Sequence, residues 1–241
     1  MTEAEWLAAT DPQPMLEHVK PDEEARKTRL LKCACCRYVW HLLTDARSRK
    51  GIEVAERAAD GSADSVEIEH AAHGTNAVKE SERFWNCRGP HDPLYALHTA
   101  ADAADSATRN TGFIALGIVR WVGNAAGSEA EAAGKGRPYG KEGKARFESA
   151  KQQAFFTIAS LFRDIFGNPF RPVAVESSWL TSDVRPLAEG IYQDRAFDRM
   201  PILADALQDA GCDNDDILNH CRQPGEHVRG CWVVDMLTGR K

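Results

Sequence analysis

Apolar residues recur every three or four positions along most of this chain, and prolines and glycines separate one such stretch from the next. This spacing places apolar side chains on one face of an α-helix, so each stretch predicts an amphipathic helix. The clearest predicted helices cover residues 22–44, 93–105 and 145–166. Few segments show the period-two alternation that is typical of strands. We therefore predict an all-α fold, a compact multi-helix assembly of about eight to ten helices.

The segment 125–144 interrupts this pattern. It is rich in glycine, alanine, glutamate and lysine, and Tyr139 is its only large apolar residue. Such a composition buries little apolar surface to offset the entropy cost of ordering, so we predict a flexible internal loop. The loop separates an N-terminal helical part (1–124) from a C-terminal helical part (145–241), and we expect the two parts to pack as one unit. Three glycines predict short helices in the C-terminal part: Gly211, Gly225 and Gly239.

Composition narrows the class of protein. The 241 residues carry a formal net charge of −6 at pH 7, and 43% of them are hydrophobic. This hydrophobic fraction is that of an ordinary globular chain, and the negative charge argues against a protein that coats nucleic acid. The acidic start MTEAEWLAATDPQP lacks the apolar region of a signal peptide, and no run of 18 apolar residues occurs. We therefore expect a cytoplasmic protein without membrane association, in which the 7 cysteines are reduced.

Two cysteines and two histidines near the C-terminus have the donor types of a zinc site. They are Cys212, His220, His227 and Cys231, spaced C-x7-H-x6-H-x3-C, with Cys221 as an alternative ligand. Structural zinc sites use four tetrahedral donors of these types, so zinc is the candidate cofactor. The spacing matches none of the compact zinc-finger patterns, which leaves an alternative open. In that alternative the cysteines pack as small apolar residues and the histidines bond to backbone carbonyls.

Two other clusters favour structural interpretations. Cys33 and Cys36 have the C-x-x-C spacing, with Cys35 and His41 nearby, but they fall in the middle of a predicted helix. A redox pair is typically found at a helix N-terminus, so core packing is favoured here. The sequence Glu67-x-x-His70 is half of a di-iron motif whose second half is absent, so a solvated helix face is favoured.

The N-terminal block TEAEWLAATDPQPML and the C-terminal blocks AFDRMPILADALQDAGC and HVRGCWVVD form a recognisable set. Together they resemble a family of uncharacterised bacterial proteins that occur as many paralogues per genome. The resemblance covers both ends of the chain and is weak across roughly residues 65–145. It implies no reaction, because that family has no established activity. Related C-terminal segments occur on longer multidomain proteins, which implies that this segment is a portable module.

The sequence does not determine the function. Nucleotide-binding, hydrolase and metalloprotease motifs are absent, which favours a helical interaction or regulatory module whose partner is another protein. One alternative is a metal-dependent enzyme that uses histidine and cysteine ligands and keeps one coordination position open. The other is a nucleic-acid-associated factor that uses the basic segment 135–146, although nucleic acid is not the expected partner.

Overall fold

The computed structural model describes residues 1–22, 25–81, 87, 92, 94–109, 114–134 and 140–240. Within these ranges the chain consists of α-helices, short 3-10 helices and connecting segments, without strands. The predicted all-α class is confirmed, with 12 α-helices in the described part where about eight to ten were expected. None of these helices combines the length and the apolar character that crossing a membrane requires.

The chain divides into two compact units, Met1–Ala159 and Ser160–Lys241. The boundary lies inside the long helix α8 (Lys141–Phe166), whereas we expected the segment 125–144 to separate the two parts. The N-terminal unit contains α1 (Glu3–Ala8), α2 (Pro12–Val19), α3 (Arg26–Tyr38), η1 (Trp40–Leu42), α4 (Ala46–Ala59), α5 (Ser65–Lys79), α6 (Tyr95–Arg109), α7 (Ile114–Ala133) and the first part of α8. The C-terminal unit contains the end of α8, η3 (Ser177–Trp179), α9 (Val184–Asp194), η4 (Phe197–Arg199), α10 (Met200–Asp209), α11 (Asp215–Arg222) and α12 (Trp232–Thr238).

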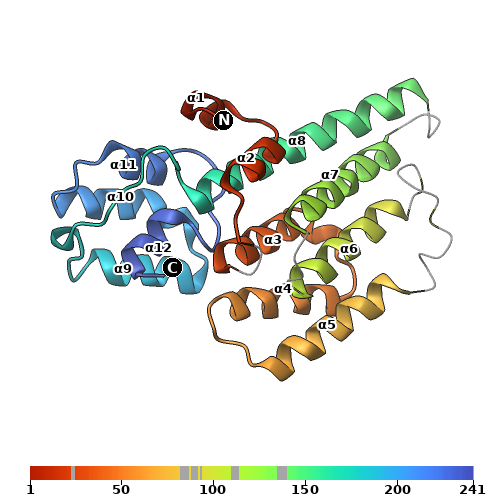
Figure 1. Ribbon diagram of the computed structural model, residues 1–241, viewed down its shortest axis with the longest axis horizontal. Helices are drawn as coiled ribbons and strands as arrows, with labels where there is room; N and C mark the ends of the chain where they lie inside the picture. The colour runs from red at the N-terminus through yellow and green to blue at the C-terminus, as the bar shows by residue number, and fades with distance from the viewer. Residues whose placement is uncertain are drawn as a thin grey trace. The chain divides into compact units, whose positions relative to one another are not determined.

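Helix α6 is central to the N-terminal unit, where it contacts α3, α4, α5 and α7 (Figure 1). Its buried positions are mostly alanines, so the neighbouring helices approach it closely. Gly51 of α4 marks a close approach to both α5 and α6. A Cβ atom at this position would meet the methyl group of Thr75 and would lie 2.7 Å from the hydroxyl oxygen of Thr108. The packing of α4 against α5 and α6 therefore requires glycine here.

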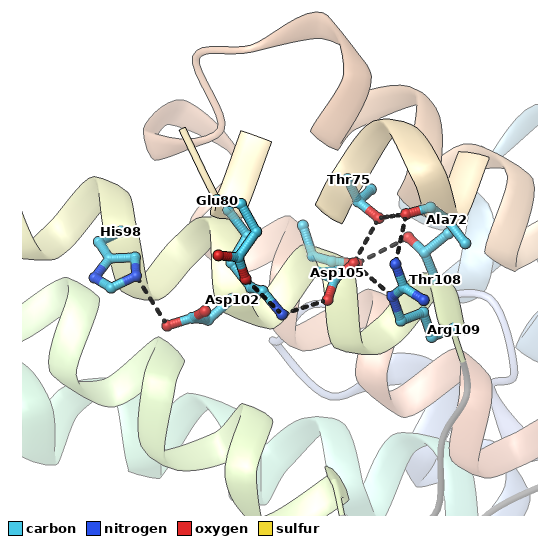
Figure 2. Close-up of polar contacts among 10 residues, drawn as sticks. Ala72, Thr75, Glu80, His98, Asp102, Asp105, Thr108 and Arg109 are labelled. Atoms are coloured by element: carbon cyan, nitrogen blue, oxygen red, sulfur yellow. Dashed lines mark hydrogen bonds and ion pairs between the residues drawn. The ribbon is translucent and has the colours of Figure 1, made fainter. Parts of the chain in front are cut away.

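A buried carboxylate links α5 to α6 in the same unit. Asp105 accepts hydrogen bonds from the hydroxyl of Thr75 at 3.0 Å and from the guanidinium Nε of Arg109 at 2.9 Å. The ammonium group of Lys79 lies 3.0 Å from its other oxygen. Figure 2 shows the side chains of Thr75 and Arg109 directed at the same oxygen of Asp105. The side chain of Asp105 is only 5% exposed, and hydrogen-bond donors surround it. A carboxylate can be buried in its charged form when such donors replace water.

Both bounds of the loop predicted at 125–144 differ from the structure, where the connection between α7 and α8 is shorter. Helix α7 continues through Ala133, and α8 already begins at Lys141. Residues 135–139, at the centre of the expected loop, lie outside the described residues.

Glycine packing explains why this segment is helical without large apolar residues. A Cβ atom on Gly127 of α7 would lie 2.9 Å from the ring of Phe147 on α8, and one on Gly123 would meet the ring of Phe155 in the same way. The large apolar side chains that pack against the last part of α7 are thus contributed by α8. The alanines and glutamates of the segment add high helix propensity.

The C-terminal unit has a hydrophobic core of its own. Its fully buried residues come from four short helices and include Val184, Ile191, Leu203, Leu207, Ile217 and Val234. Helices α9 to α12 are between 7 and 11 residues long, as the glycines predicted. Asn214 caps α11, because its side chain accepts the backbone N–H of Ile217 at 3.1 Å.

Candidate metal centre

Four side chains that offer metal-ligand atoms converge in the C-terminal unit. Asp164 lies in the last turn of α8, His220 in the last turn of α11, His227 in the connection that follows, and Cys231 at the N-cap of α12. One ligand atom from each side chain lies within 4.8 Å of those of the other three. These four residues could hold a metal ion.

The backbone between α11 and α12 delivers two of the four donors. The connection turns at Gly230, whose φ of 94° lies in the left-handed region that glycine adopts at little steric cost. Cys231 follows immediately, and its carbonyl accepts the N–H of Asp235 at 2.9 Å, which starts α12. The thiol is thereby fixed at the beginning of a helix whose buried residues belong to the core of the unit.

The distances describe a compact cluster. Oδ1 of Asp164 lies 2.6 Å from Nδ1 of His227 and 3.2 Å from Nε2 of His220. Sγ of Cys231 lies 3.3 Å from Nε2 of His220 and 3.9 Å from Nδ1 of His227. The side chains of Asp164, His220 and His227 are 3%, 8% and 5% exposed, and Cys231 is fully buried.

A second layer of contacts orients these donors. The backbone N–H of Val228 donates to Oδ2 of Asp164 at 2.9 Å, which leaves Oδ1 facing the two imidazoles. The side-chain amide of Gln223 lies 3.2 Å from Nδ1 of His220, on the side of the ring opposite the cluster. The indole of Trp232 packs against the same imidazole, with ring centroids 5.2 Å apart. These contacts fix the orientation of the Asp164 carboxylate and of the His220 imidazole.

Burial and hydrogen bonding set the protonation of the cluster. Burial acts to raise the pKa of Asp164, but hydrogen bonds from His220 and His227 outweigh it and leave the pKa below its ordinary value. Burial raises the pKa of the Cys231 thiol well above its ordinary value, and the Asp164 carboxylate raises it further. At neutral pH the cluster therefore pairs a carboxylate with a neutral thiol.

The arrangement differs from a catalytic cysteine relay. In such a relay one imidazole nitrogen takes the thiol proton while the other nitrogen of the same ring bonds to the carboxylate. Here Nε2 of His220 faces both Asp164 and Cys231, and Nδ1 of His227 does the same. The four donors point at a common centre, and the thiol is shielded from solvent. This geometry suits binding an ion more than attacking a substrate.

The structure brings together three of the four residues that the sequence analysis selected: His220, His227 and Cys231. Cys212 is not part of this group and lies in the apolar core of the unit, as does the alternative ligand Cys221. Burial raises the pKa of both thiols, that of Cys221 to about 12. These two cysteines therefore have the surroundings of small apolar residues.

Asp164 was missed by the sequence analysis because it is far from the other donors in the chain. The sequence nevertheless carries a signal that Asp164 is buried. Asp164 follows the core residue Leu161 by three positions and precedes Ile165, so it lies beside the apolar stripe of α8. A charged residue at such a position is rarely buried without a partner.

The remaining cysteine cluster lies in the N-terminal unit. Cys33, Cys35 and Cys36 are all buried in α3, and burial raises the pKa of Cys35 to about 12. His41 lies 2.8 Å from the carboxylate of Glu129. These are the surroundings of core thiols and of a surface ion pair.

The Glu67 and His70 pair lies on α5. The carboxylate of Glu67 is already engaged by the guanidinium group of Arg57.

Comparison of the chain with protein-family models, with curated proteins and with solved structures finds no match in any of the three.

Proposed function

We propose that Ser160–Lys241 is a zinc-binding helical module in which Asp164, His220, His227 and Cys231 hold one structural zinc ion. In this proposal the protein acts by binding another protein and not by catalysing a reaction. The observation that carries the proposal is the convergence of four buried donors on one centre.

The donor set matches zinc in type and charge. One thiolate, two imidazoles and one carboxylate oxygen are all ligands that zinc accepts, whereas calcium and magnesium prefer oxygen donors alone. Binding removes the proton from Cys231, so the thiolate and the Asp164 carboxylate together balance the two positive charges of the ion. A neutral centre is the form that a buried site tolerates best.

Burial supports a structural role for the ion. Catalytic zinc sites use three protein ligands and keep one position open for water or substrate, whereas structural sites use four. Four protein donors are available here, and all of their side chains are nearly or fully shielded from solvent. A filled coordination shell leaves recognition to the surface of the module. We place the module in a reducing compartment, the cytoplasm, because Cys231 binds the ion as a free thiolate.

Metal analysis of the full-length chain tests the proposal. We expect one zinc ion per chain in the wild-type protein and none in a Cys231→Ala variant. Cys212→Ala is the matched control, since Cys212 is a buried cysteine of the same unit outside the cluster, and this variant should keep its zinc. Wild-type protein that binds no zinc, or a Cys231→Ala variant that keeps it, would overturn the proposal.

Cobalt substitution distinguishes a structural centre from a catalytic one. Co(II) in this site should show the visible bands of a tetrahedral ion and a thiolate-to-metal charge-transfer band. A closed site predicts that added azide leaves the spectrum unchanged. A spectrum that shifts with azide would reveal an open coordination position and would favour the metal-dependent enzyme instead.

A further inference from the structure

We infer that Gln223 is a positioning residue of the metal centre: its side-chain amide selects the tautomer of His220, so that His220 binds the ion through Nε2 while His227 binds through Nδ1. This inference rests on the proposed zinc site and adds an assignment of ligand atoms and a residue outside the four donors.

The geometry separates the two nitrogens of His220. Nε2 faces the cluster, 3.2 Å from Oδ1 of Asp164 and 3.3 Å from Sγ of Cys231. Nδ1 faces away from it, 3.2 Å from Nε2 of the Gln223 side chain. In His227 the roles are reversed, because Nδ1 faces Asp164 and Cys231. The two histidines would therefore ligate through different ring nitrogens.

Metal binding places a requirement on the proton of His220. A neutral imidazole carries one N–H, and only the nitrogen without it can bind a metal. With the amide nitrogen of Gln223 donating to Nδ1, the ring proton lies on Nε2, where it donates to Asp164. For Nε2 to bind the ion, the ring proton must instead lie on Nδ1. That N–H then needs an acceptor behind the ring.

Gln223 can provide that acceptor without any movement of the backbone. A rotation of its amide by half a turn exchanges the nitrogen for the oxygen, which then accepts from Nδ1–H. The residue sits at the C-cap of α11, three positions after His220, and its side chain is exposed, so space for this rotation is available. Such a contact behind a ligating histidine fixes both its tautomer and its orientation.

His227 lacks an equivalent contact. Its Nε2 atom is buried and has no hydrogen-bond partner among the described residues. The orientation of His227 therefore depends on Asp164, whose Oδ1 lies 2.6 Å from Nδ1. Of the two histidines, only His220 therefore has a side chain, that of Gln223, that can select its tautomer.

Three variants of the full-length protein test the inference through zinc affinity, measured by competition with a chromophoric chelator. Gln223→Leu removes the acceptor and should weaken zinc binding by about tenfold or more. Gln223→Glu supplies an acceptor without a donor and should keep the affinity within a few-fold of wild type. Gln208→Leu is the matched control: Gln208 is a hydrogen-bonded glutamine of the same unit that contacts Arg222, and its loss should leave the affinity unchanged.

A spectroscopic measurement separates positioning from a general structural effect. In ¹⁵N-histidine spectra of the zinc-bound wild type, His220 should carry its proton on Nδ1 and His227 on Nε2. With ¹¹³Cd in the site, coupling should reach Nε2 of His220 and Nδ1 of His227. Gln223→Leu should broaden or shift the signals of His220 and leave the unfolding temperature of the metal-free protein unchanged.

The outcomes distinguish this inference from the proposed function. Equal zinc affinity in wild type and Gln223→Leu, or coupling of the metal to Nδ1 of His220, would overturn the inference and leave the zinc site standing. A wild-type protein that binds neither zinc nor cadmium would overturn both.

Discussion

Asp164 and Asp102 are both carboxylates with restricted access to water, and their surroundings shift their pKa values in opposite directions. Burial acts to raise the pKa of Asp164, but the imidazoles of His220 and His227 outweigh it and lower the pKa. Burial dominates at Asp102 and raises its pKa, because His98, whose imidazole lies 3.6 Å away, and Lys79 offset the burial only in part. Figure 2 shows His98 and Asp102 facing each other on α6. Hydrogen bonds from the protein replace the lost hydration of Asp164, whereas they replace that of Asp102 only in part.

Replacing Asp102 by asparagine should stabilise the protein at neutral pH. A raised pKa means that the folded state binds the proton more tightly than the unfolded state does. The unfolding free energy that Asp102 contributes therefore falls as pH rises from its unfolded pKa of about 3.9 to its folded value. The groups around it are His98, Lys79, Asp105 and Glu80.

Urea unfolding at several pH values measures this effect. The gain in unfolding free energy from Asp102→Asn should grow between the unfolded and the folded pKa of Asp102 and stay constant above the folded pKa. It should vanish below about pH 4, where Asp102 is protonated in both the folded and the unfolded wild type. Asp105→Asn should instead destabilise, because it removes the partner of Lys79 and Arg109. An Asp102→Asn variant that is less stable than wild type at pH 7 would contradict the argument.

Glycine contacts set how closely the helices of the N-terminal unit approach one another. Gly51 admits Thr75 and Thr108, and Gly127 admits the ring of Phe147. Gly74 of α5 differs, since a Cβ atom there would meet the side chain of Arg47 at 3.6 Å, an ordinary contact. Two glycines in neighbouring helices thus have opposite expected responses to a methyl group.

Gly51→Ala should lower the free energy of unfolding by roughly 1–3 kcal/mol, the usual cost of overpacking. Gly74→Ala should leave it unchanged or raise it by about 0.5–1 kcal/mol, because alanine has the higher helix propensity. Chemical denaturation followed by circular dichroism at 222 nm, the usual helix wavelength, measures both. Equal effects of the two substitutions would show that the contact at Gly51 is less restrictive than its geometry indicates.

Both compact units have a buried apolar core, and each also buries a polar cluster. The N-terminal unit buries ion pairs and small side chains among α3 to α7. The C-terminal unit combines an apolar core with the four-donor cluster, which joins the end of α8 to α11, α12 and their connection. If the cluster binds zinc, the ion cross-links short helices that bury limited apolar area individually.

Removal of the metal should therefore act on one unit. With a chelator, amide hydrogen exchange should increase between residues 220 and 235 and stay unchanged in α4, α5 and α6. Hydrogen exchange read by mass spectrometry resolves these segments. A Cys231→Ala variant serves as the control, since it should exchange rapidly at 220–235 with or without chelator. Uniform acceleration across both units would contradict a local role for the ion.

The helical spacing of apolar residues was sufficient to predict the all-α fold class and the positions of long helices. Apolar residues at helical spacing predicted 93–105 and 145–166, and the structure has α6 and α8 there. Local signals suffice for such elements, because caps, propensity and a continuous apolar stripe all act within a few turns. The same reasoning failed at 125–133, where α7 contributes glycines and the apolar surface comes from α8.

Which residues belong to the candidate site depends on how the helices of the C-terminal unit pack. His220, His227 and Cys231 lie within 11 positions of one another, so their donor types and proximity were visible in the chain. Cys212 was indistinguishable from them by type, yet the packing of its unit places it in the apolar core. Asp164 lies 63 positions before His227 and reaches the cluster through the end of α8. Spacing along a chain reports local geometry, whereas the meeting of distant donors depends on how helices pack in three dimensions.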